Sequence, residues 1–219
     1  MTDLVFVGTG GQARELHAIT EALGARWSPI GFLDDESTTS GTEIHGLPVL
    51  GSIDWLADNH STVVAVGIGS PSTKRSVVAR IEGFGPRRFP TLVHPAASVG
   101  PRVTLGDGVF VGPNTVVTTD VVVGDHVLLN FGCTVGHDAD IKNFATLGPG
   151  AHVSGRVRVE EGVDVGTGAS IIQGLRIGEW SIVGAGTVVV RDVAANTTVV
   201  GNPGVVIKHR EPGWHLAET

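Results

Sequence analysis

An aliphatic side chain returns at every sixth position between residues 93 and 189. The residue four places after each of these positions is small or apolar, from Ala97 to Val193. A strict period of six over this length is typical of a parallel β-helix, and an ordinary sandwich or barrel would not keep it. The seventeen aliphatic positions are Val93, Val99, Leu105, Val111, Val117, Val123, Leu129, Val135, Ile141, Leu147, Val153, Val159, Val165, Ile171, Ile177, Val183 and Val189.

Each hexad predicts one short strand and one turn, so that three hexads close one triangular coil. The aliphatic side chain would fill the interior of the coil, and the small residue would lie near a corner. Glycine follows the aliphatic residue in nine hexads, where it allows turn conformations that a Cβ disfavours. Strands of successive coils would pair in parallel about 4.8 Å apart, which makes the five to six coils roughly 27 Å tall.

The chain before this repeat has a different pattern, in which apolar runs alternate with amphipathic stretches. Ser72 is a candidate N-cap for the second amphipathic stretch. Alternating strands and helices predict a small, Rossmann-like βαβ domain with a parallel sheet. The expected strands cover residues 4–8, 29–36 and 63–69, and the expected helices cover residues 12–23 and 72–82.

The change of pattern near Phe89-Pro90 divides the chain into a βαβ domain over residues 1–91 and a β-helix over residues 92–194. Residues 195–219 leave the period, and we expect them to cap or trail from the last coil. The end strands of a β-helix need cover, which the βαβ domain would give the first coil. Because the outer faces of the prism stay partly apolar, we expect a homotrimer.

Composition narrows the class of protein. Glycine is 32 of 219 residues, about twice the usual share, which agrees with a turn in every hexad. The net charge is −7 without any basic run, so nucleic acid is not an expected partner. The single cysteine, Cys133, excludes a disulfide framework and favours a reducing compartment. No apolar run approaches a membrane span and no basic leader segment is present, so we expect a soluble cytoplasmic protein.

Glycines and acidic residues gather at the carboxyl ends of the expected strands. The glycines after the first strand would place backbone N–H groups and a helix amino terminus where a phosphate can bind, although turn geometry alone would also explain them. The two aspartates after the second strand could bind a ribose or base, or could simply end the strand. All these residues share the edge where parallel sheets usually bind ligands. They are Gly8, Gly10, Gly11, Asp34, Asp35, Gly67 and Gly69.

His137 follows the interior residue Val135 by two positions, so its side chain should point out of the prism. The position one coil later is Gly155, which leaves open space beside the imidazole. Asp138 is adjacent, and Asn130 precedes it in the previous hexad. A neutral imidazole whose tautomer is held by a carboxylate is a common general base at pH 7. The sequence therefore indicates His137 as the candidate base, with a solvated surface histidine as the alternative.

The other histidines carry weaker signals. His126 and His152 also lie on the prism. No two histidines are four residues apart, and clustered cysteine and histidine ligands are absent, so no metal site is expected. Cys133 falls in the interior register, which argues against a nucleophilic role. The isolated histidines expected at the surface are His17, His45, His60, His209 and His215.

Several segments carry a resemblance that covers nearly the whole chain. They are VGTGGQARE at 7–15, FLDD at 32–35, the hexads, NFGCTVGHDADI at 130–141, IGEWSIVGAGTVVVRDV at 177–193 and VGNPGVVIK at 200–208. With these segments the chain resembles the bacterial sugar acetyltransferases related to sialic acid O-acetyltransferase and the nucleotide-4-amino-sugar N-acetyltransferases. The resemblance implies a left-handed β-helix, a homotrimer, and a nucleotide sugar held by the amino-terminal domain.

The resemblance also implies acetyl-CoA between adjacent prisms and His137 as the base, with Asp138 and Asn130 beside it. Members often carry a second histidine in the coil after the catalytic one, where this chain has a threonine. In the usual terminal motif alanine and lysine follow proline, whereas here Gly204 follows proline and the lysine comes later. The residues assigned to acetyl-CoA on this basis are Thr146, Gly155, Thr167, Ala185, Pro203 and Lys208.

The leading hypothesis is an acetyl-CoA-dependent N-acetyltransferase that acts directly on the amino group of a nucleotide-linked amino sugar. His137 would remove the proton of the attacking amine, and a backbone N–H such as that of Gly155 would stabilise the oxyanion. The enzymatic alternative is O-acetylation of a sugar such as a sialic acid, or transfer of a longer acyl group. The alternative from another class is a β-helix that binds a nucleotide sugar without catalysis.

Overall fold

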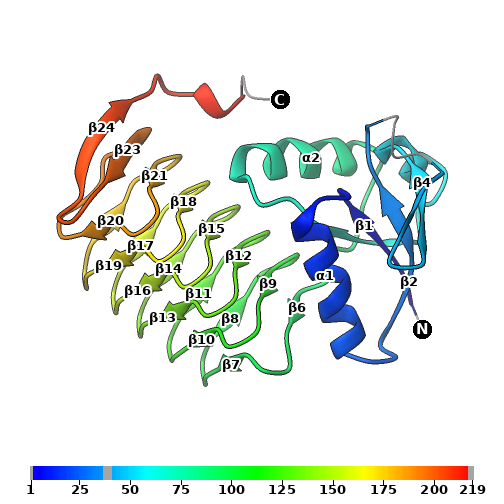
Figure 1. Cartoon of the computed structure of the whole chain (residues 1–219), viewed down its shortest axis with the longest axis horizontal. Helices are drawn as coiled ribbons and strands as arrows, with labels where there is room; N and C mark the ends of the chain where they lie inside the picture. The colour runs from blue at the N-terminus through cyan, green and yellow to red at the C-terminus, as the bar shows by residue number, and fades with distance from the viewer. Residues whose placement is uncertain (1, 37–40, 217–219) are drawn as a thin grey trace.

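The computed structural model describes residues 2–36 and 41–216. It shows an α/β domain followed by a prism of stacked coils (Figure 1). No helix in the described ranges is long and apolar enough to cross a membrane.

The amino-terminal domain is a five-stranded sheet with the strand order β3-β4-β2-β1-β5. The strands are parallel except for the antiparallel β3–β4 pair, which confirms the predicted Rossmann-like architecture. The buried Val, Leu and Phe side chains of β1 and β2 form the centre of this domain. Its elements are β1 (Thr2–Val7), α1 (Gly11–Ala22), β2 (Trp27–Leu33), β3 (Glu43–Ile44), β4 (Leu47–Gly51), the 3₁₀-helix η1 (Ile53–Ala57), β5 (Val63–Val66) and α2 (Pro71–Gly83).

The helix α2 begins one residue earlier than the sequence pattern predicted. Its N-cap is Ser70, whose hydroxyl accepts the N–H of Thr73 at 3.4 Å. Pro71 occupies the first helical position, where its missing N–H costs nothing. Ser72 lies inside the first turn and is buried, so the prediction of Ser72 as the cap was wrong.

From β6 to β22 every strand is two residues long, and the second residue of each is the aliphatic residue of the hexad. These side chains are buried except in the first coil, where Val99 is 37% exposed. The strands are β6 (Leu92–Val93), β7 (Ser98–Val99), β8 (Thr104–Leu105), β9 (Phe110–Val111), β10 (Val116–Val117), β11 (Val122–Val123), β12 (Leu128–Leu129), β13 (Thr134–Val135), β14 (Asp140–Ile141), β15 (Thr146–Leu147), β16 (His152–Val153), β17 (Arg158–Val159), β18 (Asp164–Val165), β19 (Ser170–Ile171), β20 (Arg176–Ile177), β21 (Ile182–Val183) and β22 (Val188–Val189).

Parallel pairing between residues eighteen apart gives the prism three faces, as in Val116↔Thr134. The first face has the strand order β24-β23-β21-β18-β15-β12-β9-β6. The second face has the order β22-β19-β16-β13-β10-β7, and the third has the order β20-β17-β14-β11-β8. The predicted parallel β-helix is therefore confirmed.

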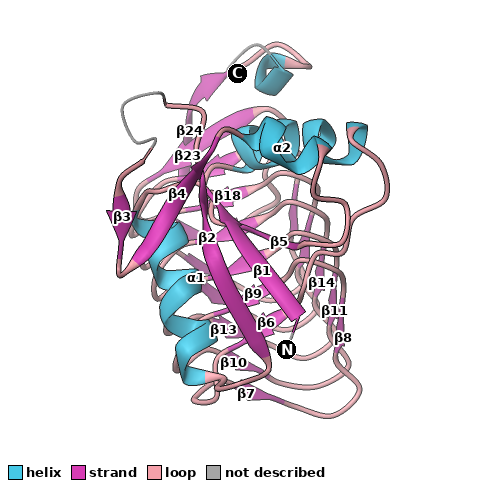
Figure 2. Cartoon of the chain, turned by 90° about the vertical axis from the view of Figure 1, so that its right-hand side faces the viewer, coloured by secondary structure: helices cyan, strands magenta, loops and turns pink. Residues whose placement is uncertain are grey.

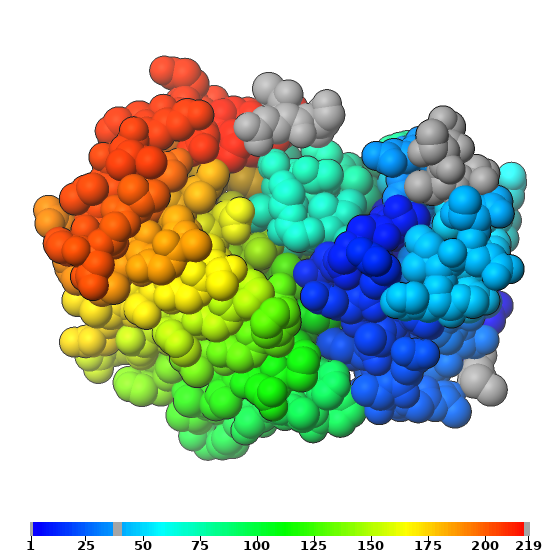
Figure 3. All heavy atoms as spheres, in the orientation of Figure 1, coloured from blue at the N-terminus to red at the C-terminus, as the bar shows by residue number. Residues whose placement is uncertain are grey.

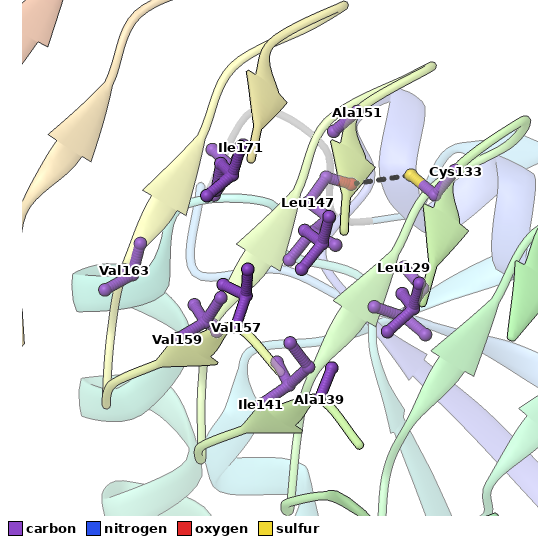
Figure 4. Close-up of a cluster of buried hydrophobic side chains, with 14 of the residues drawn as sticks. Leu129, Cys133, Ala139, Ile141, Leu147, Ala151, Val157, Val159, Val163 and Ile171 are labelled. Atoms are coloured by element: carbon purple, nitrogen blue, oxygen red, sulfur yellow. Dashed lines mark hydrogen bonds between the residues drawn. The ribbon is translucent and has the colours of Figure 1, made fainter. Parts of the chain in front are cut away.

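The interior of the prism is filled by the aliphatic residues, with small residues between them (Figure 4). Cys133 occupies one of the small positions and is completely buried. Its Sγ lies 3.2 Å from the carbonyl oxygen of Gly148. Burial raises the pKa of the Cys133 thiol to about 11, so the thiolate needed of a nucleophile is scarce near neutral pH.

The α/β domain packs against the first face of the prism (Figures 2 and 3). Leu16 and Ile19 of α1 share a buried cluster with Leu92, Phe110 and Leu128 on the outside of that face. The domain thus covers the first-face side of the prism, which includes Leu92 of the first coil, whereas Val99 on the second face of that coil stays exposed, so the predicted cover of the first coil is only partial. The corner between the second and third faces lies opposite the domain.

The segment after the hexads closes the far end of the first face. Strand β23 (Thr197–Val200) pairs in parallel with β21, and β24 (Val205–His209) returns antiparallel to β23. The chain then runs back toward α2 and ends in the 3₁₀-helix η2 (Trp214–Leu216) (Figure 1). There the ring of His215 stacks on Trp180 with 3.6 Å between the centroids, which ties the tail to the prism.

Candidate active site

His137 projects from the turn that joins the second face to the third, two residues after β13. Its side chain is 55% exposed, and its Nδ1 lies 2.7 Å from Asp138 Oδ2. The carboxylate therefore favours the tautomer with the proton on Nδ1. Nε2 then carries the free lone pair that a general base needs.

Gly155 stands one coil beyond His137 and leaves the imidazole its space. A Cβ on Gly155 would lie 2.6 Å from His137 Nε2, closer than real atoms approach. In the described part of the chain, the Gly155 N–H has no hydrogen-bond partner. The missing side chain of Gly155 therefore makes room for the imidazole itself, which fills that space, and the turn also carries this backbone N–H, unpaired among the described residues.

The backbone of Asp138 sets the direction of its carboxylate. Its φ is 58°, in the left-handed region that aspartate tolerates better than most residues. The Asp138 N–H donates to the carbonyl of Thr119 on the preceding coil at 3.2 Å. The carboxylate thus orients the neighbouring imidazole from a fixed turn.

Asn130 lies at the other end of the second face, in the turn after β12. It is 8% exposed, and its Oδ1 accepts the N–H of Phe131 at 2.8 Å. Within one chain the structure does not bring Asn130 to His137 and Asp138. The six residues between Asn130 and His137 span a whole face, so closeness in sequence does not produce contact here.

A cavity of about 460 Å³ lies at the carboxyl ends of β1, β2 and β5, beside the start of α1. The N–H groups of the first turn of α1 have no partners inside the helix and can receive an anion there. Gly67 permits close packing of its turn on α1, because a Cβ would lie 2.4 Å from Ala13 Cα. The structure brings together all seven residues that we assigned to this edge, Gly8, Gly10, Gly11, Asp34, Asp35, Gly67 and Gly69.

Several residues of the cavity were missed in the sequence. Thr9, Gln12 and Ile53 line it, and Thr73 and Val77 reach it from α2. The Nε2 atom of Gln12 is buried and has no hydrogen-bond partner within the described ranges. The position of Thr9 inside the glycine turn was a usable signal. Thr73 and Val77 reach the cavity only through the tertiary packing of α2, which the sequence pattern does not show.

The two neighbouring aspartates of the cavity have different partners. Asp34 Oδ2 accepts the hydroxyl of Thr9 at 2.5 Å. Asp35 accepts the N–H of Ile53 at 3.1 Å and the guanidinium of Arg80 at 2.7 Å. Asp34 is therefore oriented within the wall of the cavity, whereas Asp35 fastens η1 and α2 to the sheet.

Thr146 lies on the outside of the first face and is 7% exposed. Its Oγ1 donates to the carbonyl of Gly69 at 2.8 Å and accepts a hydrogen bond from Lys74 Nζ at 3.2 Å. The structure thus places Thr146 in the contact between the two domains, with little surface open to acetyl-CoA. Thr146 follows His137 by nine residues and therefore lies on the first face, whereas His137 lies at the corner between the second and third faces.

The other residues assigned to acetyl-CoA lie on two different edges of the prism. Thr167 and Ala185 are exposed at the corner between the first and second faces, and Pro203 is exposed in the loop that follows β23. Lys208 is exposed on β24. Gly155 belongs to the corner between the second and third faces. A single chain therefore does not gather them into one site.

Two histidines that were expected at the surface are buried, because distant segments cover them. His17 is 5% exposed and packs edge-on against Phe32, and burial lowers its pKa. His215 is 9% exposed, because its ring stacks on Trp180 of the prism. Across residues 2–36 and 41–216, no group of three or more His, Cys, Asp or Glu side chains is placed to hold a metal ion.

Comparison with known proteins gives two family matches. The PglD N-terminal domain model matches residues 3–81, and the bacterial transferase hexapeptide model matches residues 102–137. No curated protein matches the chain.

The solved structures that resemble nearly the whole chain include three bacterial proteins. The acetyltransferase domain of PglB from Neisseria gonorrhoeae FA1090 is 32% identical, with a TM-score of 0.86 over 94% of this chain and 100% of that one. A mutant of perosamine N-acetyltransferase from Caulobacter crescentus is 29% identical, with a TM-score of 0.87 over 95% and 98%. WeeI from Acinetobacter baumannii AYE is 28% identical, with a TM-score of 0.86 over 94% and 100%.

The α/β domain, the hexapeptide prism and the histidine on its outer turn define an acyltransferase of the hexapeptide-repeat class. The chain belongs to the PglD-like family of acetyltransferases, together with the PglB acetyltransferase domain.

Proposed function

We propose that this protein transfers the acetyl group of acetyl-CoA to the amino group of a nucleotide-linked amino sugar, with His137 as general base. The observation that carries the proposal is the pairing of His137 with Asp138, with the imidazole lying over Gly155. Two relatives support the choice of substrates. The PglB acetyltransferase domain has been solved with acetyl coenzyme A, and the Caulobacter crescentus enzyme with CoA and GDP-perosamine.

The cavity of the α/β domain suits a nucleoside diphosphate. The amino end of α1 and the glycine turn before it offer N–H groups to a pyrophosphate. Asp34 offers a carboxylate to ribose hydroxyls, and Ile53 and Val77 supply apolar surface for a base. None of the lining residues is basic, so the phosphates would be held by backbone groups.

The chemistry requires one proton to pass from the amine through His137 to the CoA thiolate, and it requires no covalent enzyme intermediate. The amine nitrogen attacks the thioester carbonyl, and His137 Nε2 takes the proton as the N–C bond forms. Asp138 stabilises the resulting imidazolium, and the N–H of Gly155 is a candidate donor to the oxyanion. The C–S bond then breaks, and the imidazolium returns the proton to the CoA thiolate.

A homotrimer would complete this site. The nucleotide cavity lies on the side of the first face, while His137 lies at the opposite corner of the same prism. A sugar held in the cavity would therefore reach the His137 of a neighbouring chain. In that arrangement Thr167 and Ala185 of one chain and Gly155 of the next border a shared groove for acetyl-CoA, with Pro203 and Lys208 toward its end. Asn130 would reach the neighbour's base in the same way.

The test is release of CoA thiol from acetyl-CoA in the presence of UDP-, GDP- and dTDP-linked 4-amino sugars. Thiol release with at least one of them, together with an acetamido product identified by mass spectrometry, is the expected result. Thiol release only with hydroxyl acceptors would identify an O-acetyltransferase. Thermal stabilisation by a nucleotide but not by acetyl-CoA would identify a binding module instead. Because nucleotide sugars and acetyl-CoA are cytoplasmic metabolites, we place the reaction in the cytoplasm.

A further inference from the structure

Lys74 is a buried cation at the contact between the two domains. It lies in the first turns of α2, which runs along the first face of the prism (Figure 1), and it is 3% exposed. Its Nζ donates to Thr146 Oγ1 at 3.2 Å. A buried ammonium is costly unless it has partners, so the position of Lys74 demands an explanation. Neither the glycine turn of the cavity nor the pair at His137 uses it directly.

The hydroxyl of Thr146 joins Lys74 to the wall of the nucleotide cavity. Thr146 Oγ1 donates to the carbonyl oxygen of Gly69 at 2.8 Å, and Gly69 lines that cavity. The chain continues from Gly69 through the N-cap Ser70 into α2, where the Lys74 N–H donates to the Ser70 carbonyl at 2.9 Å. Thr146 therefore fastens both the glycine turn and the first turn of α2 to the prism.

One charged and one titratable group on the prism face Lys74, the first from a strand and the second from a turn. Asp164 on β18 pairs with Thr146 in the parallel ladder, and the Lys74 charge partly offsets the rise that burial causes in the Asp164 pKa. His126 lies on the other side, where burial first and the Lys74 charge second lower its pKa. Burial lowers the pKa of Lys74 itself to about 7, against the attraction of Asp164.

We propose that Lys74 and Thr146 are positioning residues that hold the nucleotide cavity at a fixed place on the prism through the hydrogen-bond chain Lys74–Thr146–Gly69. They touch neither substrate and act through Gly69. This role rests on the proposed nucleotide-sugar site. An ammonium can only donate, so Lys74 forces the Thr146 hydroxyl to donate to Gly69 rather than to the lysine. A neutral lysine amine can accept a hydrogen bond from the Thr146 hydroxyl, which then no longer donates to the Gly69 carbonyl.

The test uses Thr146→Val, which keeps the shape but removes both hydrogen bonds, and Thr146→Ser, which retains them. Isothermal titration with UDP, GDP and dTDP identifies the nucleotide that wild type binds, and acetyl-CoA is titrated in parallel. We expect Thr146→Val to weaken nucleotide binding roughly three- to tenfold, the loss expected for one or two hydrogen bonds. Acetyl-CoA binding should stay at the wild-type value, and Thr146→Ser should restore nucleotide binding.

Thr104→Val is the matched control, since Thr104 is an exposed threonine on the third face, away from the α/β domain. Lys74→Met should weaken nucleotide binding as Thr146→Val does. We expect the nucleotide affinity of wild type to fall between pH 6 and pH 8, as Lys74 loses its proton, and Lys74→Met should remove that fall. A lower melting temperature for Thr146→Val with unchanged nucleotide affinity would show a merely structural contact and overturn the proposal. Failure of wild type to bind any of the three nucleotides would instead overturn the proposed function.

Discussion

At the scale of single residues, the position of the proposed base, His137, depends on the missing side chain of Gly155. Gly155 is buried against His137, and its missing side chain leaves the space in which Nε2 lies. The eighteen-residue coil made this opening predictable, because the position stacked on His137 could be counted along the chain. The same counting puts Asn130 and Thr146 away from the corner that carries His137, but it does not show that the α/β domain covers Thr146.

Gly155→Ala should lower kcat by at least about tenfold, because a Cβ would lie 2.6 Å from His137 Nε2 and must displace the imidazole from its position. The melting temperature should change little, since the displaced side chain is exposed. Gly83→Ala is the control, because a Cβ at Gly83 meets nothing within 4 Å. Wild-type kcat in Gly155→Ala would show that the imidazole does not act from this position.

Asp34→Asn should weaken nucleotide binding more than Asp35→Asn, because the Asp34 carboxylate is oriented within the cavity wall while Asp35 is occupied by Arg80 and Ile53. We expect roughly a tenfold increase in Kd for Asp34→Asn, as for one hydrogen bond to a charged group. Both Kd values can be measured by titration with the nucleotide that wild type prefers. The reverse order of effects would refute the distinction between the two carboxylates.

At the scale of elements, the hexad predicted the strands more closely than the rest of the chain. Each aliphatic residue lies at the second position of a two-residue strand because the interior of a triangular coil accepts only one large side chain per face. The predictions that failed concern contacts between segments. Ser72 was taken for a cap because the exact first turn of α2 is not visible in the pattern, and the cover of His17 comes from a separate strand.

His126 should make the prism sensitive to acid. It is buried between Phe89 and Phe144, and burial together with the Lys74 charge lowers its pKa to about 4, below its usual 6.5. The folded state therefore binds fewer protons than the unfolded state between these values. The stability contribution of neutral His126 is complete above pH 6.5 and is lost as the pH falls toward 4.

His126→Phe keeps an aromatic ring in this slot and removes the titrating group. Its melting temperature should fall less between pH 7 and pH 4.5 than that of wild type, as measured by circular dichroism. Parallel melting curves for the two proteins over this range would contradict the assignment.

At the scale of the whole molecule, the α/β domain and His137 lie on opposite sides of one prism. The separate parts were readable from the sequence, since each has its own period. Their relative placement was not, because it depends on the packing of α1 and α2 against the first face. That placement supports the proposal of a site shared between chains.

Mixed trimers test the shared site. His137→Ala chains retain the cavity and Asp34→Arg chains retain the base, so each pure variant should be nearly inactive. Co-assembly of the two chains should restore one working site in every mixed trimer, because one cavity then faces one intact His137. Activity would stay absent in mixed trimers if cavity and base acted within a single chain. Separately purified and unmixed proteins serve as the control.

The most direct test of the central claim is kcat for CoA thiol release by wild type and by His137→Ala, with the amino-sugar nucleotide that wild type prefers. Loss of the general base should reduce kcat roughly 10²- to 10⁴-fold while the fold and nucleotide affinity remain intact. In wild type, kcat should also rise with pH, and this rise should be absent in His137→Ala. A folded His137→Ala protein that keeps more than about a tenth of the wild-type kcat would contradict the assignment of His137 as the base.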